Sequence, residues 1–376
     1  MLGRGRTARW VRHRRPLVTA GAGAVLAVKC RKAELRALRE TPTTGRPVDI
    51  LVELSRDGGQ VAGLVDAAKR AAWDGRPLWI DPTHLGPDSA LARFGDPLGE
   101  LERRIEDTLG LIRHDAPPLL PVVAATADDR ERRHVRNLLE HQARPVAVRC
   151  RSASQHDPAW LVARLRALST SLGLPTGGLH LVLDEGFVER VEPWRVRSVV
   201  SLGRWVAGEV PLGSMTLLAG STPRQRSGHD RVVRPLAEVD LWEQVHPELG
   251  FPLRYGDYGA VHPAPSFSKP SPQAPPNPYL HYTLLRHRLT VARRVPGRTG
   301  RVVPSGASAR YFREVAEDVV GHRDYAGPGF SWGDRCLHRC RTDPRISVGT
   351  AQSWIAYATS HHLAQLSHRP PGAPVR

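Results

Sequence analysis

The sequence has few cysteines, few lysines and no long apolar run. No uninterrupted apolar stretch reaches the ~18 residues that a membrane-spanning helix requires, which argues against an integral membrane protein. Four cysteines in 376 residues are too few for a disulfide scaffold, and they fit a reducing, cytoplasmic compartment. A hydrophobic fraction of 40% with 24% charged residues excludes wholesale disorder. Only four of the 54 basic residues are lysines (Lys29, Lys32, Lys69 and Lys269), so arginine carries almost all of the positive charge.

The formal net charge of +17 is concentrated at the two ends of the chain. Residues 1–46 and 251–376 each carry a net charge of +10, whereas residues 47–250 carry −3, and no acid lies between Asp257 and Glu314. Because arginine pairs well with phosphate, this distribution favours a surface that faces a polyanion. A solvated basic loop and GC-rich codon usage are the alternatives. The arginines expected to contact nucleic acid are Arg286, Arg288, Arg293, Arg294, Arg298 and Arg301.

The N-terminal residues have two interpretations. Basic residues from Arg4 to Arg15 precede an apolar stretch, Leu17–Val28, as in a signal peptide. The alternative is a basic arm followed by a buried strand that begins at Ala24. The second is favoured because the basic cluster Lys29–Lys32 follows the apolar stretch at once, and cleavage would cut into the strand. We therefore assign residues 1–23 to a basic arm or a mis-assigned leader.

Short apolar segments alternate with amphipathic helices between residues 24 and 263. Most of the apolar segments show no polar alternation, which is typical of strands buried on both faces of a parallel sheet. The predicted strands are Ala24–Cys30, Val48–Leu54, Pro77–Asp81, Leu119–Ala125, Pro145–Arg149, Leu179–Asp184, Met215–Ala219 and Phe251–Gly256. The predicted helices are Val61–Trp73, Pro97–Ile112, Asp128–Gln142, Pro158–Leu172 and Glu189–Val206.

Eight such strands with intervening helices predict an α/β fold, a (β/α)₈ TIM-like barrel. An open doubly wound sheet is the alternative, but it requires a glycine-rich phosphate turn where Lys29–Lys32 stands. A proline-rich loop follows at residues 264–278, then a C-terminal α+β element over residues 279–368 and a disordered tail over 369–376. This element is predicted to contain an extended stretch (Tyr279–Val295), a helix (Ser308–Val320), a glycine-rich turn (Gly327–Asp334) and a last helix (Thr350–Ala364).

Six segments spread along the chain have a recognisable order and spacing: Val28–Leu38, Pro77–Asp81, Gly256–Pro263, Tyr279–Thr283, Phe330–Asp334 and Thr359–Leu363. Together they resemble the phage-type beta protein family, which occurs in phages, satellite prophages and bacterial genomes. Two positions depart from the pattern, because Ser360 stands where asparagine is expected and Ala358 where glycine is typical. The resemblance implies a phage-related or defence context, and it supplies no reaction.

Charged residues stand at the carboxyl ends of nearly all the predicted strands, where barrel enzymes place their sites. Carboxylates there can hold Mg²⁺ or Mn²⁺ while arginines hold phosphate oxygens, which suits a phosphoesterase. The alternative is that Asp81 and Asp184 pair with Arg149 and Arg151 and seal the barrel end. The candidate catalytic residues are Asp81, Asp184, Asp257 and His361; the candidate ligand-binding residues are Lys29, Arg31, Glu53, Arg149, Arg151, Tyr258, Ser331, Asp334 and His362.

The C-terminal element offers three further candidates. One histidine of the pair His361–His362 can act as general acid or base beside Asp257 if the element folds over the barrel mouth, whereas a histidine near a helix C-terminus is also favourable for structural reasons. Cys336, His338 and Cys340 invite a zinc hypothesis, although a matching second pair is missing. The aromatic residues Trp332, Trp354 and Tyr357 are expected to pack the element onto the barrel, with base stacking as the alternative.

Three functions from different classes are consistent with these features. The first is a factor that binds nucleic acid or another phosphate-bearing ligand without chemistry of its own. The second is an antidote-like protein that binds a toxin-like or defence partner protein. The third, the alternative to both, is a metal-dependent phosphoesterase or nuclease. The cofactor expected for the phosphoesterase is Mg²⁺ or Mn²⁺, and no membrane partner is expected.

Overall fold

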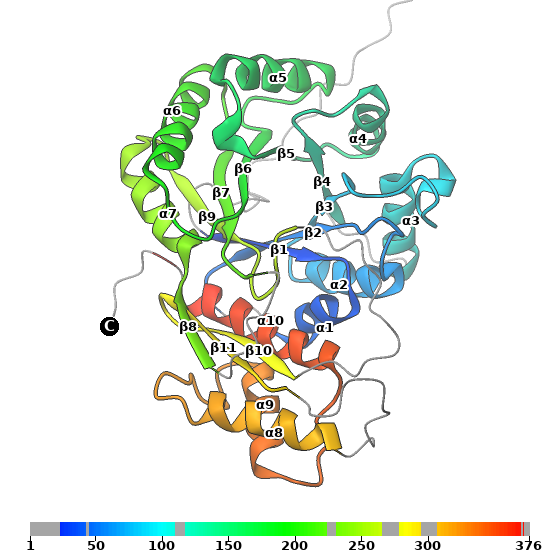
Figure 1. Cartoon of the computed structure of the whole chain (residues 1–376). Helices are drawn as coiled ribbons and strands as arrows, with labels where there is room; N and C mark the ends of the chain where they lie inside the picture. The colour runs from blue at the N-terminus through cyan, green and yellow to red at the C-terminus, as the bar shows by residue number, and fades with distance from the viewer. Residues whose placement is uncertain are drawn as a thin grey trace, which may run out of the picture.

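The computed structural model describes residues 23–42, 45–109, 117–223, 231–264, 278–294, 307–369 and 371. Eight parallel strands form a closed barrel, because the last of them pairs with the first (Figure 1). This confirms the predicted (β/α)₈ barrel and excludes the open doubly wound sheet. In barrel order the strands are β1 (Ala24–Lys29), β2 (Val48–Glu53), β3 (Leu78–Asp81), β4 (Leu119–Ala124), β5 (Val146–Arg151), β6 (Leu179–Phe187), β7 (Ser214–Gly220) and β9 (Leu253–Asp257).

Both faces of the barrel strands are buried, which explains their lack of polar alternation. In β1, Val25 and Ala27 join the cluster inside the barrel, whereas Ala24, Leu26 and Val28 join the larger core between the strands and the surrounding helices. Every residue of β1 is buried, including Lys29 at its carboxyl end. A buried lysine at this point requires partners at the barrel mouth.

Helices surround the barrel, and their starts follow the expected capping chemistry. The Asp128 carboxylate accepts from the Glu131 amide, and the Glu131 carboxylate accepts from the Asp128 amide in return. At the start of α5 (Pro158–Ser171), Asp157 accepts from the Trp160 amide. One prediction was wrong at its boundary, because the helix expected from Glu189 begins only at Pro193, a favoured first helical residue. The helices are α1 (Lys32–Glu40), α2 (Val61–Trp73), α3 (Pro97–Leu109), α4 (Asp129–His141), α5 (Pro158–Ser171), α6 (Pro193–Glu209) and α7 (Ala237–Val245), with 3₁₀ turns at Ala92–Phe94, Ala153–Gln155 and His246–Glu248.

A second, smaller core belongs to an antiparallel sheet and the helices beside it. The sheet order is β10 (Tyr279–Thr283), β11 (His287–Ala292) and β8 (Arg231–Pro235), and the helices are α8 (Ala307–Val320), α9 (Trp332–Thr342) and α10 (Ala351–His368). The sequence did not predict β8, which is short and largely exposed, or α9, whose start lies in the segment expected to be a turn. Ser331 in that segment caps α9 by accepting from the Asp334 amide.

The last helix, α10, occupies the position of the eighth barrel helix. Ala356 of α10 packs against Ala33 and Ala37 of α1, and Leu363 and Leu366 join the barrel core. The C-terminal sheet lies on the other side of α10, so the element covers the side of the barrel and not its mouth (Figure 1). The element therefore does not fold over the mouth, as a role of His361 or His362 as general acid or base there would require.

Several predictions concern residues outside the described ranges. These are most of the basic arm (residues 1–22), most of the proline-rich loop (265–277), most of the tail, and two of the candidate nucleic-acid contacts, Arg298 and Arg301. Among the described residues, no helix combines the length and apolarity needed to cross a membrane.

The buried histidine of β6 makes the stability of the barrel depend on pH. His180 lies 2.7 Å from the Ser214 hydroxyl and edge-on to Trp79, and burial, with the charge of Arg254, lowers its pKa from 6.5 to about 4. Between these two pKa values, His180 binds a proton in the unfolded chain and not in the folded chain. Stability is therefore lost as the pH falls through this window. We expect the free energy of unfolding to fall by on the order of 3 kcal/mol from this group.

Urea unfolding at a series of pH values between neutrality and about pH 4 measures this loss. The variant His180→Gln should flatten the dependence, whereas substitution of the exposed His141 by glutamine should leave it unchanged. Equal slopes for the parent and His180→Gln would show that another group carries the pH dependence.

Candidate functional site

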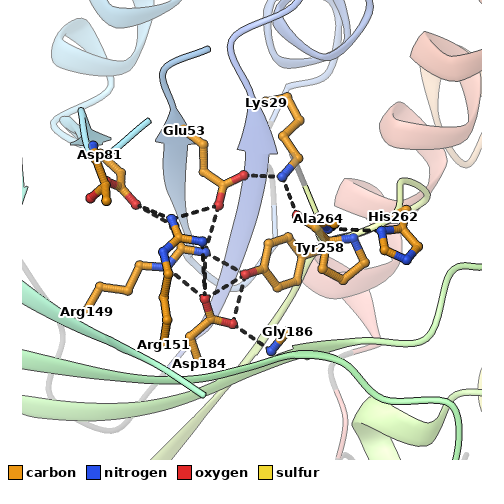
Figure 2. Close-up of polar contacts among 12 residues, drawn as sticks. Lys29, Glu53, Asp81, Arg149, Arg151, Asp184, Gly186, Tyr258, His262 and Ala264 are labelled. Carbon is orange, nitrogen blue, oxygen red and sulfur yellow. Dashed lines mark hydrogen bonds and ion pairs between the residues drawn. The ribbon is translucent and has the colours of Figure 1, made fainter. Parts of the chain in front are cut away.

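The predicted strand-end residues meet at the barrel mouth around one arginine. Arg149, near the end of β5, is 1% exposed and reaches carboxylates from three other strands (Figure 2). Its guanidinium nitrogens lie 2.5 Å from Asp81 of β3, 3.0 Å from Asp184 of β6 and 2.7 Å from Glu53 of β2. It also donates to the Tyr258 hydroxyl at 2.5 Å, and Tyr258 in turn donates to Asp184 at 2.8 Å. Parallel strands end at one edge, which is why residues far apart in sequence converge here.

Two further cations complete this network. Lys29 pairs with Glu53 and donates to the Pro263 carbonyl at 2.5 Å. Arg151, whose side chain is 31% exposed, donates to Asp81 at 3.1 Å and lies 3.4 Å from Glu53. Three carboxylates therefore face three cations, and the network of Lys29, Glu53, Asp81, Arg149, Arg151, Asp184 and Tyr258, called here the mouth network, carries no net charge.

The cations hold two of the carboxylates, Asp81 and Glu53, in the ionised form. Burial alone raises the pKa of Asp81, but Arg149 and Arg151 outweigh it and bring the pKa to about 2. For Glu53, burial is likewise outweighed by Arg149 and Lys29, so its pKa lies below the usual value. A backbone amide adds to this for Asp81, which accepts a hydrogen bond from Thr83. A carboxyl group that stays ionised to such low pH is a poor proton donor at neutral pH.

The mouth network also bears on the predicted metal. Its carboxylates converge on a guanidinium, whereas a Mg²⁺ or Mn²⁺ site needs carboxylate oxygens around an open centre. Within the described ranges, no three His, Cys, Asp or Glu side chains are grouped so that they could hold a metal ion, and this includes Cys336, His338 and Cys340. A pocket of about 210 Å³ opens beside the mouth, between Thr83 and His134, but neither Arg149 nor its partners line it. Arg31 lies apart, at the N-cap of α1, near Glu34.

His362 and Asp257 meet as the sequence suggested, but in a buried position between the barrel and α10. The His362 Nε2 atom lies 2.9 Å from both oxygens of Asp257, and its Nδ1 atom lies 2.8 Å from the Thr283 hydroxyl. Asp257 also accepts from the Tyr255 hydroxyl and the Gly259 amide. With its hydrogen-bonding groups engaged and each side chain about 1% exposed, this pair joins β9, β10 and α10 and offers no face to a substrate.

His361 is also buried, and both of its ring nitrogens are engaged. Its Nδ1 atom lies 2.9 Å from Asp334 and its Nε2 atom 2.7 Å from the Thr283 carbonyl oxygen, so both nitrogens face acceptors. Asp334 further accepts from Tyr282 and Ser331, and the Tyr282 ring stacks on His361. The His361 side chain therefore has no access to a substrate. Ser331, Asp334 and His362 form internal hydrogen bonds instead of a ligand site.

The arginines around β10 and β11, called here the C-terminal hairpin, are largely neutralised in three dimensions. Arg286 pairs with Asp240 and Glu243 of α7, buried Arg288 pairs with Glu238, and Arg293 pairs with Asp318 of α8. The stretch without acids in the sequence is therefore not without acids in space. Of the six predicted contacts, only Arg294 is described and exposed without such a partner.

Cations without a carboxylate partner gather instead on α1 and α9. Lys32 and Arg36 on α1, and Arg335 and Arg339 on α9, make no ion pair within the described part of the chain. Each pair is four residues apart, which places its members on one side of the helix. The Arg36 guanidinium lies 5.0 Å from the centre of the Trp332 ring, so the two helices bring their cations together. We call these five residues the α1/α9 face; the four-residue spacings are the signal that the sequence analysis missed.

Comparisons with known proteins were informative for the family alone. The family model described as Beta protein matches residues 25–368, nearly the whole chain. Among solved structures, a fructose-bisphosphate aldolase from Campylobacter jejuni is similar over 63% of this chain and 71% of its own, at 11% sequence identity and a TM-score of 0.36. A likeness at that level carries no argument about function. A search of curated proteins finds no match.

Removal of Arg149 should destabilise the barrel strongly. The variant Arg149→Gln leaves Glu53, Asp81 and Asp184 buried with one cation fewer, and breaking a buried ion network in this way costs about 3–5 kcal/mol. Urea unfolding measures the change. The matched control, Arg130→Gln, removes an exposed arginine and should shift the free energy of unfolding by less than about 0.5 kcal/mol. Similar small losses in both variants would mean that the mouth network does not hold the barrel together.

Proposed function

The chain belongs to the Beta protein family, and on that premise we propose that it is a phage- or defence-associated protein that acts by binding nucleic acid through the α1/α9 face. The observation that carries the proposal is the set of four cations, Lys32, Arg36, Arg335 and Arg339, which have no carboxylate partner among the described residues. Lys32, Arg335 and Arg339 are exposed and Arg36 is partly exposed. A phosphate backbone is the natural complement of such a surface.

The position of the uncompensated charge supports this assignment. The mouth network is neutral, and the described hairpin arginines are mostly paired, so neither leaves a comparable cluster of free cations. Like charges four residues apart on a helix destabilise it by about 0.2–0.5 kcal/mol per pair. Both α1 and α9 carry such a pair, and a bound polyanion relieves the repulsion.

The metal-dependent phosphoesterase is not proposed here. That activity requires carboxylate oxygens that converge on an open centre, whereas Glu53, Asp81 and Asp184 converge on Arg149. An antidote-like role, in which the same face binds an acidic partner protein, has no observation that favours it over nucleic acid, and it becomes an outcome of the test.

Binding should weaken steeply with salt, and the α1/α9 face should set the steepness. The log of the affinity for a labelled oligonucleotide is expected to fall linearly with the log of the salt concentration. Each lost phosphate contact lowers the slope by about 0.9 on duplex DNA or about 0.7 on a single strand. The double variant Arg335→Gln/Arg339→Gln should therefore reduce the slope by about twice that amount, as measured by fluorescence anisotropy over a series of salt concentrations.

The control removes the same charge elsewhere. Arg166 and Arg190, 57% and 84% exposed on the barrel, are replaced by glutamine together and should leave the slope unchanged. An equal loss in both double variants would point to net charge and not to this face. If the oligonucleotide does not bind at low salt and the protein instead retains an acidic partner protein, the proposal is contradicted and the antidote-like role is favoured.

A further inference from the structure

Trp332 and Arg36 form a stacked pair within the α1/α9 face. Trp332 is the first residue of α9, and it packs against Ala33 and Ala37 of α1 and Ala356 of α10. Its ring is also edge-on to Tyr357, 5.2 Å between centres. These contacts fix the plane of the indole, and the guanidinium of Arg36 lies over that plane at 5.0 Å from its centre. Arg36 itself is partly exposed.

From this pair we infer that the α1/α9 face binds single-stranded nucleic acid, with one base stacked on the outer side of the Arg36 guanidinium and the flanking phosphates on Lys32, Arg335 and Arg339. The inference rests on the proposed function and names its substrate class. A guanidinium is planar and has two faces, so an arginine that covers an aromatic ring on one side presents the other side to a second planar group.

Base stacking is what separates a single strand from a duplex here. In a duplex the faces of the bases are stacked on each other, so the α1/α9 face would meet phosphates alone. In a single strand the bases are free to stack on aromatic rings and guanidinium planes, and this supplies affinity with little dependence on sequence. A cationic surface with a stacking centre therefore prefers the single strand.

The neighbouring Cys336 thiol does not neutralise these cations. Cys336 is partly buried beside Arg335, Arg36 and Arg339, and burial raises its pKa more than the three arginines lower it. The thiol therefore stays protonated at neutral pH, and no thiolate offsets the positive charge that the phosphates meet.

The test compares three DNA probes of equal length: a single strand, the duplex of the same sequence and a single strand with an abasic site at every position. All three present phosphates, but the abasic strand has no bases. The parent protein should bind the intact strand about tenfold more tightly than the abasic strand, and more tightly than the duplex, as judged by anisotropy at one salt concentration.

The diagnostic variant is Arg36→Lys, which keeps the charge and removes the planar group. It should weaken binding of the intact strand several-fold and leave binding of the abasic strand nearly unchanged. Arg39→Lys is the matched control, since it makes the same change on the same helix without an aromatic ring beneath it. Circular dichroism and urea unfolding of both variants check that α1 remains folded.

Two outcomes overturn the inference, and they are distinguishable from failure of the proposed function. Equal affinity for intact and abasic strands, or an effect of Arg36→Lys no larger than that of Arg39→Lys, would show that Arg36 only buttresses Trp332, while nucleic-acid binding itself would stand. If none of the three probes binds at low salt, the proposed function fails and the inference fails with it.

Discussion

The burial of Arg149 is the constraint on which the barrel depends. A guanidinium removed from water costs several kcal/mol unless charged partners replace the lost hydration. Its partners come from β2, β3 and β6, and Tyr258 after β9 adds a hydroxyl. The carboxylates have the same requirement in reverse, because each is about 2% exposed or less. A strand displaced by one residue would move its carboxylate to the opposite face of the sheet and leave both charges unpaired, so the mouth network helps to set the register of the barrel.

A second set of buried polar pairs performs the same task between the barrel and the C-terminal element. His362 with Asp257, and His361 with Asp334, tie α10 to β9, β10 and α9. Adjacent histidines on a helix point in different directions, so one residue reaches the barrel and the next reaches the C-terminal core. Ser360 serves similarly, since its hydroxyl accepts from Thr41 after α1 and from the Gly333 amide of α9. The segment Thr359–Leu363 thus joins the two cores.

The barrel could be predicted because its strands are written in the sequence as short apolar runs, each followed by a helical pattern. The strand-end charges were predictable for the same reason, as Glu53, Asp81, Arg149 and Asp184 all stand where a run stops. Whether those carboxylates face a metal or a guanidinium was not predictable, because it depends on which side chain of β5 points into the barrel and how far it reaches. The hairpin arginines show the limit clearly: Arg288 looks unopposed in the sequence, and Glu238, fifty residues earlier, neutralises it in space. The α1/α9 face was missed because Arg36 and Trp332, which are far apart in the sequence, become neighbours only when α9 packs against α1.

The place of α10 in the ring has a consequence for the order of folding during synthesis on the ribosome. All eight barrel strands and the first seven helices are translated before α10, yet Leu363 and Leu366 of α10 belong to the barrel core and Ala356 covers α1. Until that helix emerges, β1 and β2 lack its cover, and the apolar side of α1 faces water. Long-range contacts of this kind slow folding, and apolar surface that is prone to aggregation stays exposed until they form. Docking of α10 is thus the step that completes the barrel and covers this surface.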